Sequence, residues 1–170
     1  MKLIIGSLTA VAILIALACQ TNSSAKQTDA IYEQGQTPPG GKRVVKTNAE
    51  WKKILTPDQY VVLREHGTER AGTSPLLNVH EEGTFHCAAC KNPLFAEKTK
   101  FESGTGWPSF YEPISRNAVK VAKDNTYGME RDEVVCSVCD GHLGHVFNDG
   151  PKPTGLRYCM NGVAMTFQKK

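Results

Sequence analysis

The chain has 170 residues, of which 40% are hydrophobic and 22% charged, with a formal net charge of +3 and six cysteines. This composition is typical of a globular protein and excludes a disordered, a collagen-like or a coiled-coil chain. The basic residues are scattered among 17 acidic ones, so no nucleic-acid partner is expected. Six cysteines are too few for a disulfide scaffold at this length, but they suffice for a metal site and a further role.

Residues 1–18 are predicted to be an export signal. Lys2 precedes an uncharged apolar run that ends in Ala16-Leu17-Ala18, directly before Cys19. The run is shorter than the roughly 20 residues of a membrane-spanning helix, and small residues close it as signal peptidase requires. A cysteine at this place resembles the lipobox of bacterial lipoproteins, although the leucine is displaced by one position. We expect a lipid anchor on Cys19 and a location in the periplasm or cell envelope; secretion with a free cysteine is the alternative.

The next segment, residues 19–43, is predicted to be a flexible linker. It is rich in Gln, Ser, Thr, Gly and Pro and has almost no apolar residues. Such a composition cannot bury enough surface to offset the loss of chain entropy. The folded domain is therefore expected over residues 44–170.

Two short helices are predicted at the start of this domain. Thr47 and Glu50 form a capping box that begins the first helix. Thr56 caps the second, Pro57 suits its first turn, and Gly67 ends it. The predicted apolar faces are Trp51, Ile54 and Leu55 in the first helix, and Tyr60, Val61 and Leu63 in the second.

Beyond these helices the chain consists of short runs typical of β-strands, separated by Gly, Pro and Asn. The spacing predicts a mainly β domain with antiparallel pairing. The clearest runs cover residues 84–86, 118–121, 133–135 and 163–167.

Two C-x-x-C pairs, Cys87 with Cys90 and Cys136 with Cys139, are separated by 45 residues. A predicted strand precedes each pair, and Gly141 follows the second pair, as a sharp turn requires. Four thiolates in this pattern suit one tetrahedral zinc ion per chain, which would clip distant parts of the domain together. Two disulfides formed in an oxidising compartment remain an alternative. A thioredoxin-like redox motif is less favoured, because neither pair opens a helix after a strand.

Cys159 is left over and lies two residues after Arg157. If this segment is a strand, both side chains share a face, and a neighbouring cation lowers a thiol pKa. His142 and His145 lie upstream. Spacing alone still favours a buried packing cysteine, and the histidines could be zinc ligands or core residues.

Longer motifs decide between these interpretations. Asn92-Pro93-Leu94-Phe95 follows the first cysteine pair, residues 101–110 read FESGTGWPSF, residues 141–147 read GHLGHVF, and residues 157–161 read RYCMN. Together they resemble the methionine sulfoxide reductase B family, in the family's order and over Thr47 to Gln168. The resemblance implies a fold of two small antiparallel β-sheets with short N-terminal helices. It also implies reduction of the R epimer of methionine sulfoxide; oxidised proteins are the expected substrate, and the free amino acid is left open as a second one.

The resemblance assigns roles residue by residue. Cys159 corresponds to the nucleophile that attacks the sulfoxide sulfur, and His145 to the proton donor. Asn161 is expected to hydrogen-bond near the nucleophile or to orient that histidine. Trp107 and His142 are expected to line the substrate pocket, with Trp107 against the ε-methyl group of the substrate. On sequence grounds alone, Trp107 could also be a core residue.

One departure from the family concerns turnover. Many relatives have a cysteine at the position of Thr105, and that thiol resolves the sulfenic acid on the nucleophile. Threonine cannot do this, so we expect an external reductant, either a thioredoxin-like protein or a small thiol. Arg157 and Asp149 are expected to be structural or to tune a pKa, and the protein is expected to be a monomer. A non-catalytic zinc-binding module or a thiol-based redox sensor is the competing hypothesis, but it requires only the four zinc ligands.

Overall fold

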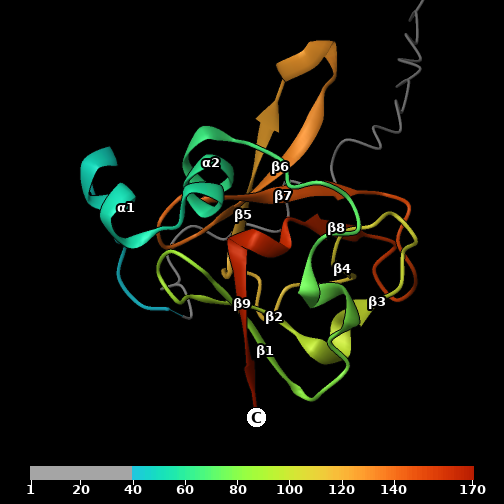
Figure 1. The fold of residues 1–170 in the computed structure, drawn as a ribbon. Helices are drawn as coiled ribbons and strands as arrows, with labels where there is room; N and C mark the ends of the chain where they lie inside the picture. Colours follow the sequence, from blue (N-terminus) through green and yellow to red (C-terminus); the bar gives the residue numbers. More distant parts are fainter. Residues whose placement is uncertain (1–39) are drawn as a thin grey trace, which may run out of the picture. The chain divides into compact units, whose positions relative to one another are not determined.

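The computed structural model describes residues 40–170 (Figure 1). The predicted signal, Cys19 and the linker as far as residue 39 lie outside the described residues. At the end of the predicted linker, the Gly40 amide donates to Asn92 Oδ1 at 2.7 Å, and Arg43 pairs with Asp140. No helix within residues 40–170 combines the length and apolar character needed to cross a membrane.

Two helices begin where the capping boxes predict them. Helix α1 covers Asn48–Ile54 and helix α2 covers Pro57–Glu65, and both capping boxes are complete. The predicted end of α2 is wrong: the helix stops at Glu65, and His66 closes it in the left-handed conformation with φ of 56°. The apolar faces also need correction, because Ile54 and Val61 are exposed and Val62 is buried instead.

The nine strands of the described region form two antiparallel sheets, as predicted (Figure 1). The last predicted run starts late, because residues 163–164 belong to a 3-10 turn, η6 (Gly162–Ala164), that precedes β9. The three-stranded sheet has the order β2 (Pro93–Ala96), β1 (Gly83–Cys87) and β9 (Met165–Lys169). The six-stranded sheet has the order β3 (Lys100–Phe101), β4 (Ser109–Phe110), β8 (Arg157–Met160), β7 (His142–Phe147), β6 (Arg131–Cys136) and β5 (Val119–Asp124).

Aromatic side chains from both sheets form the centre of the core. Phe85 of β1 and Phe95 of β2 both pack on Phe110 of β4, with ring centroids 4.9 and 4.4 Å apart. Tyr158 of β8 packs on Phe95 at 5.7 Å. All four residues are at most 2% exposed, so the burial of their large apolar surface holds the two sheets together.

The hairpin of β5 and β6 projects from this core, as Figure 1 shows. Its six residue pairs run in regular register from Val119–Cys136 to Asp124–Arg131. The next strand, β7, pairs with β6, and β8 pairs with β7. The hairpin therefore brings its own polar side chains beside the strands that carry the predicted catalytic residues.

Candidate active site and metal centre

The four cysteines of the two C-x-x-C pairs converge on one point. All four Sγ atoms lie within 4.8 Å of one another, with 3.7 Å between Cys87 and Cys139 and 3.5 Å between Cys90 and Cys136. A disulfide needs a separation of about 2.05 Å, so these cysteines form no disulfides. Four sulfurs around a zinc ion at about 2.3 Å would stand about 3.8 Å apart. The donor set and its spacing therefore fit tetrahedral zinc.

Both cysteine pairs sit in turns of the same backbone conformation. The Lys91 amide donates to the Cys87 carbonyl, and the Asp140 amide donates to the Cys136 carbonyl, each at 2.9 Å. Lys91 and Asp140 are both left-handed, with φ of 63° and 54°. Because Cys87 ends β1 and Cys136 ends β6, the cluster links the two sheets.

Gly141 has a different role from the one predicted. The left-handed residue of the second turn is Asp140, and Gly141 instead permits close packing: a Cβ at this position would lie 2.9 Å from Leu63 Cδ2 of α2. The sharp turn predicted at Gly141 is therefore displaced by one residue.

A fully buried amide supports the cluster from the side. Asn92 Nδ2 donates to the Ala118 carbonyl at 2.9 Å and lies 3.6 Å from Cys136 Sγ. Hydrogen bonds from the neighbouring thiols, first Cys139 and then Cys87, lower the pKa of Cys136. The surroundings therefore stabilise a thiolate, the form that binds metal.

The predicted nucleophile lies in a row of side chains that crosses the six-stranded sheet. Ser109, Cys159, His145 and Glu133 are direct partners on β4, β8, β7 and β6, so they share one face of the sheet. Cys159 and His145 are half-buried. Gly144 is needed for this pairing, because a Cβ there would overlap the Cys159 carbonyl oxygen. The structure thus places the predicted nucleophile directly opposite the predicted proton donor.

The predicted strand geometry of Arg157 and Cys159 is confirmed by β8, on which they occupy alternate positions. Arg157 forms a two-point ion pair with Asp149 at 2.9 and 2.8 Å and lies over the Phe147 ring at 4.5 Å. Asp149 raises the pKa of Arg157, and Cys159 adds a smaller contribution. The guanidinium is thus a fixed cation beside the thiol.

A loop carries Trp107 to the same region. Thr105 Oγ1 lies 3.8 Å from Cys159 Sγ, and the half-buried Trp107 follows two residues later. The indole Nε1 donates to the Glu69 carbonyl at 3.1 Å. Trp107 and Ser103 line a cavity of about 280 Å³. The loop therefore places an anchored indole near the nucleophile.

Asn161 fixes the backbone around these residues. Its Nδ2 donates to the Leu143 carbonyl at 3.1 Å, inside the GHLGH run, and its Oδ1 accepts from the Glu69 amide at 2.9 Å. The Glu69 carboxylate accepts from the amides of Gly162 and Val163 at 2.6 and 2.9 Å. Asn161 and Glu69 together tie the Trp107 loop to the end of β8.

A carboxylate on the projecting hairpin holds His145. Asp124 Oδ2 lies 2.8 Å from His145 Nε2 and 2.7 Å from Arg131 Nη2. Asp124 also accepts from the Thr126 amide and hydroxyl at 2.9 and 2.6 Å. Thr126 contributes most to keeping the pKa of Asp124 well below its usual range, and His145 contributes less. The carboxylate is therefore ionised when it orients the imidazole.

A second carboxylate holds His142. His142 is 2% exposed, and its Nδ1 lies 2.6 Å from Glu133 Oε1, while His66 Nδ1 lies 2.7 Å from the same oxygen. Burial lowers the pKa of His142, and Glu133 opposes this shift. His142 Nε2 is buried without a hydrogen-bond partner among the described residues. The His142 ring also lies 5.4 Å from that of His145, so the structure brings both predicted histidines together.

Comparison with known proteins places the chain in a family. The profile of the SelR domain matches residues 55–169. Proteins named peptide methionine sulfoxide reductase MsrB are 56% identical in Leptospira interrogans, over 127 residues, and 57% identical in Methanosarcina barkeri, also over 127 residues. Each match covers 75% of this chain, with 97% and 89% of the respective relative. The chain belongs to the methionine sulfoxide reductase B family. Its mainly β fold of two antiparallel sheets agrees with that membership.

Three acidic residues of this MsrB-family site were not predicted from the sequence: Glu69, Asp124 and Glu133. Each bonds a site residue at least nine positions away in the chain. The sequence holds one signal for Asp124. Residues 124–126, Asp-Asn-Thr, are typical of a turn in which the Asp side chain accepts from the backbone amide two residues on, and they form such a turn at the end of the hairpin. Glu133 is a charged residue within a strand-like apolar run, which also hints at a polar partner.

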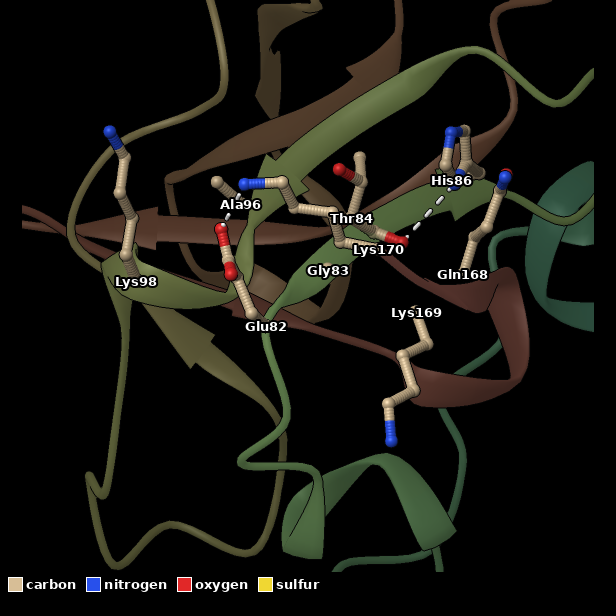
Figure 2. A pocket seen from close by; sticks show the side chains of 9 residues that line it. All are labelled: Glu82, Gly83, Thr84, His86, Ala96, Lys98, Gln168, Lys169 and Lys170. Atoms are coloured by element: carbon tan, nitrogen blue, oxygen red, sulfur yellow. Dashed lines mark hydrogen bonds and ion pairs between the residues drawn. The ribbon is translucent and has the colours of Figure 1, made fainter.

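A separate hollow lies on the three-stranded sheet of this MsrB-family chain, away from the residues discussed above. It measures about 390 Å³ and is lined by residues of β1, β9 and their flanks. Figure 2 shows that Lys170 is paired with Glu82 and that His86 bonds the Thr84 carbonyl of its own strand. None of the predicted site residues lines this hollow.

Proposed function

We propose that the protein is a peptide-methionine (R)-S-oxide reductase with Cys159 as its nucleophile. The observation that carries the proposal is the position of half-buried Cys159 directly opposite His145 on β7. The names of the family relatives support the same reaction. Oxidised proteins and free methionine sulfoxide are the proposed substrates.

The first step transfers oxygen from the substrate to the enzyme. The Cys159 thiolate attacks the sulfoxide sulfur, and His145 supplies a proton to the oxygen. The protonated oxygen passes to the Cys159 sulfur as the S–O bond of the substrate and the new bond between the two sulfurs break, so methionine leaves and Cys159 becomes a sulfenic acid. Asp124 holds the imidazole through Nε2, and the Arg157 guanidinium, fixed by Asp149, lies beside Cys159.

The remaining site residues bind and orient the substrate. Trp107 offers an apolar wall whose indole N–H is already bonded to Glu69, so the ring is held in place. His142 is the second proposed substrate-binding residue, and its ring lies 5.4 Å from that of His145. Asn161 acts as a positioning residue, because its amide bonds the backbone of β7 and of the Trp107 support rather than a reacting atom.

The second step needs a thiol from outside the domain. Two external thiols reduce the sulfenic acid, which regenerates the Cys159 thiol and releases a disulfide and water. Four of the five cysteines within residues 40–170 belong to the cluster, and Thr105 lies next to Cys159.

Thr105→Cys should therefore allow a disulfide with Cys159 after turnover. Failure of that variant to lose two hydrogen masses would contradict the proposed role of position 105.

The cysteine cluster is proposed to hold one structural zinc ion. Its spacing fits the metal, and it joins β1 to β6 across the two sheets. A zinc ion bound there supplies no reaction step and stabilises the fold. We expect about one zinc per chain in the purified protein, measured by elemental analysis.

The cellular location rests on the sequence alone. We propose export and lipid attachment at Cys19, which would place the reductase at a membrane surface of the cell envelope as a monomer. Mass spectrometry of the mature N-terminus tests this: a diacylglycerol adduct on Cys19 supports it, and an unmodified secreted or uncleaved N-terminus contradicts it.

One assay tests the reaction. The protein is incubated with racemic methionine sulfoxide and a dithiol, and we expect turnover to stop when about half of the racemate is consumed. Cys159→Ser should abolish turnover while it retains the metal. Equal activity of Cys159→Ser would overturn the assignment, and a metal-loaded wild type without any turnover would favour the non-catalytic module.

A further inference from the structure

A second group of potential metal ligands lies outside the cysteine cluster. His66 Nδ1, His142 Nδ1 and Glu133 Oε1 all lie within 4.8 Å of one another. Both nitrogens point at the same carboxylate oxygen, from 2.7 and 2.6 Å. The two imidazoles come from different elements, one from the end of α2 and one from β7, yet they converge on a single point.

We propose that His66, Glu133 and His142 bind a divalent transition-metal ion. Two imidazole nitrogens and one carboxylate oxygen form a donor set that suits zinc, cobalt and nickel. Such ions bind imidazole nitrogen at about 2.0–2.1 Å, which is shorter than the 2.7 and 2.6 Å that separate the two nitrogens from the shared oxygen, so both rings would move in toward the ion. A small retreat of the Glu133 carboxylate places the ion between the three ligands, and each imidazole then carries its proton on Nε2.

The charge balance favours a cation at this point. The Glu133 side chain is 11% exposed, and its ion-pair partners within residues 40–170 are the two histidines, with no lysine or arginine. A buried carboxylate with no lysine or arginine partner lacks a fixed countercharge. A divalent ion supplies that charge and forms coordination bonds with the three side chains.

The site also has an entrance. Glu133 and His142 are buried, whereas the His66 side chain is 63% exposed and sits in the left-handed turn that closes α2. An ion from solvent can reach His66 first and then the two inner ligands. The exposed side leaves a coordination position for water, unlike the four-sulfur cluster.

An ion at this site would act on the reductase, a consequence that rests on the proposed function. Glu133 lies in the same row as His145 and Cys159, two strands from the thiol, or about 10 Å. The His142 ring packs 5.4 Å from His145. The ion would lock His142 away from the substrate and add positive charge beside the proton donor. We therefore expect reversible inhibition.

Cobalt(II) is the probe that tests the site. The full chain with its native metal is titrated with cobalt, and visible d–d absorption is recorded in the absence of substrate. We expect one added cobalt per chain with a nitrogen–oxygen spectrum and no thiolate-to-cobalt charge-transfer band. His66→Asn, which keeps the left-handed turn, should weaken binding at least about tenfold, and Glu133→Gln likewise.

His86→Asn is the matched control, because His86 is a partly buried histidine on the other sheet, and it should bind as wild type does. Absence of cobalt binding, equal binding by His66→Asn, or a thiolate band alone would overturn the proposal. Because binding is read without turnover, this result is independent of the reductase assay. In that assay, cobalt should inhibit the wild type and inhibit His66→Asn at least about tenfold less strongly.

Discussion

The cysteine cluster and the Cys159 site use the same side chain in opposite surroundings. The cluster cysteines lie in two matching turns, where their sulfurs face one another at 3.5–3.7 Å. Cys159 lies within a strand, where it faces a threonine hydroxyl at 3.8 Å and pairs with His145. The first arrangement brings four sulfurs to one point, where they could share a metal ion. The second leaves one thiol open to react, so location rather than residue type assigns the function.

The largest expected effect comes from making the same cysteine-to-serine substitution in each of the two regions and comparing the results. Cys136→Ser removes one of the four proposed zinc ligands at the junction of the sheets, and we expect loss of metal and of cooperative folding. Cys159→Ser removes no ligand and no core contact, so its thermal unfolding should match the wild type. Circular dichroism with metal analysis measures both. A folded, metal-loaded Cys136→Ser protein would contradict the structural role of the cluster.

Asp124→Asn should sharpen the comparison on the catalytic side. The amide keeps the shape but lacks the charged oxygens through which Asp124 orients the His145 imidazole. We expect kcat to fall about ten- to a hundredfold, with a smaller change in KM. Asp132→Asn, on the same hairpin and paired with Lys123 at 2.9 Å, is the control and should stay near the wild type. Equal losses in both variants would point to a hairpin defect rather than to a role of His145.

Glu69→Gln tests whether Glu69 holds the Trp107 indole in place. The carboxylate accepts two backbone hydrogen bonds at the start of η6, and charge-assisted bonds of this kind contribute about 1–2 kcal/mol each. A looser loop should raise KM severalfold and leave the cluster metal in place. Glu65→Gln, on the exposed end of α2, serves as the reference. An unchanged KM would show that Trp107 is held without Glu69.

The smallest effect concerns pH. The pKa of Asp124 is held below its usual value of about 4, so its stabilising contribution is complete above that pH and is lost as the pH falls through the folded-state pKa. Wild type should exceed Asp124→Asn in free energy of unfolding by roughly 1 kcal/mol at pH 7. The difference should shrink on acidification, as urea titrations at several pH values would show. A difference that grows at low pH would contradict the assigned hydrogen bonds.

Features of the fold that depend on residues close in the sequence could be predicted, whereas features that depend on tertiary packing could not. The capping boxes fix the starts of α1 and α2 because each bond spans three residues. The sequence does not show which of Val61, Val62 and Leu63 are buried, because three consecutive apolar residues suit either face of the helix. It is decided by the packing of α2 against the sheet, which buries Val62 and leaves Val61 45% exposed.

The candidate site shows the same division. Cys159, His145 and Trp107 could be named because long motifs mark them. Asp124, Glu133 and Glu69 could not, because the strand register and loop contacts that bring them to the site span 9 to 94 residues. The partners of Asp124 and Glu133 are set by the pairing of β5 with β6 and of β6 with β7, which the sequence pattern does not align.

Peptide mass spectrometry after a single turnover without reductant tests the central claim most directly. The protein is mixed with a limiting amount of the R epimer, trapped with a sulfenic-acid reagent and digested. We expect one sulfenic-acid adduct, on Cys159, together with unmodified cluster cysteines and no new disulfide. Trapping on a cluster cysteine, or a disulfide of Cys159, would contradict it.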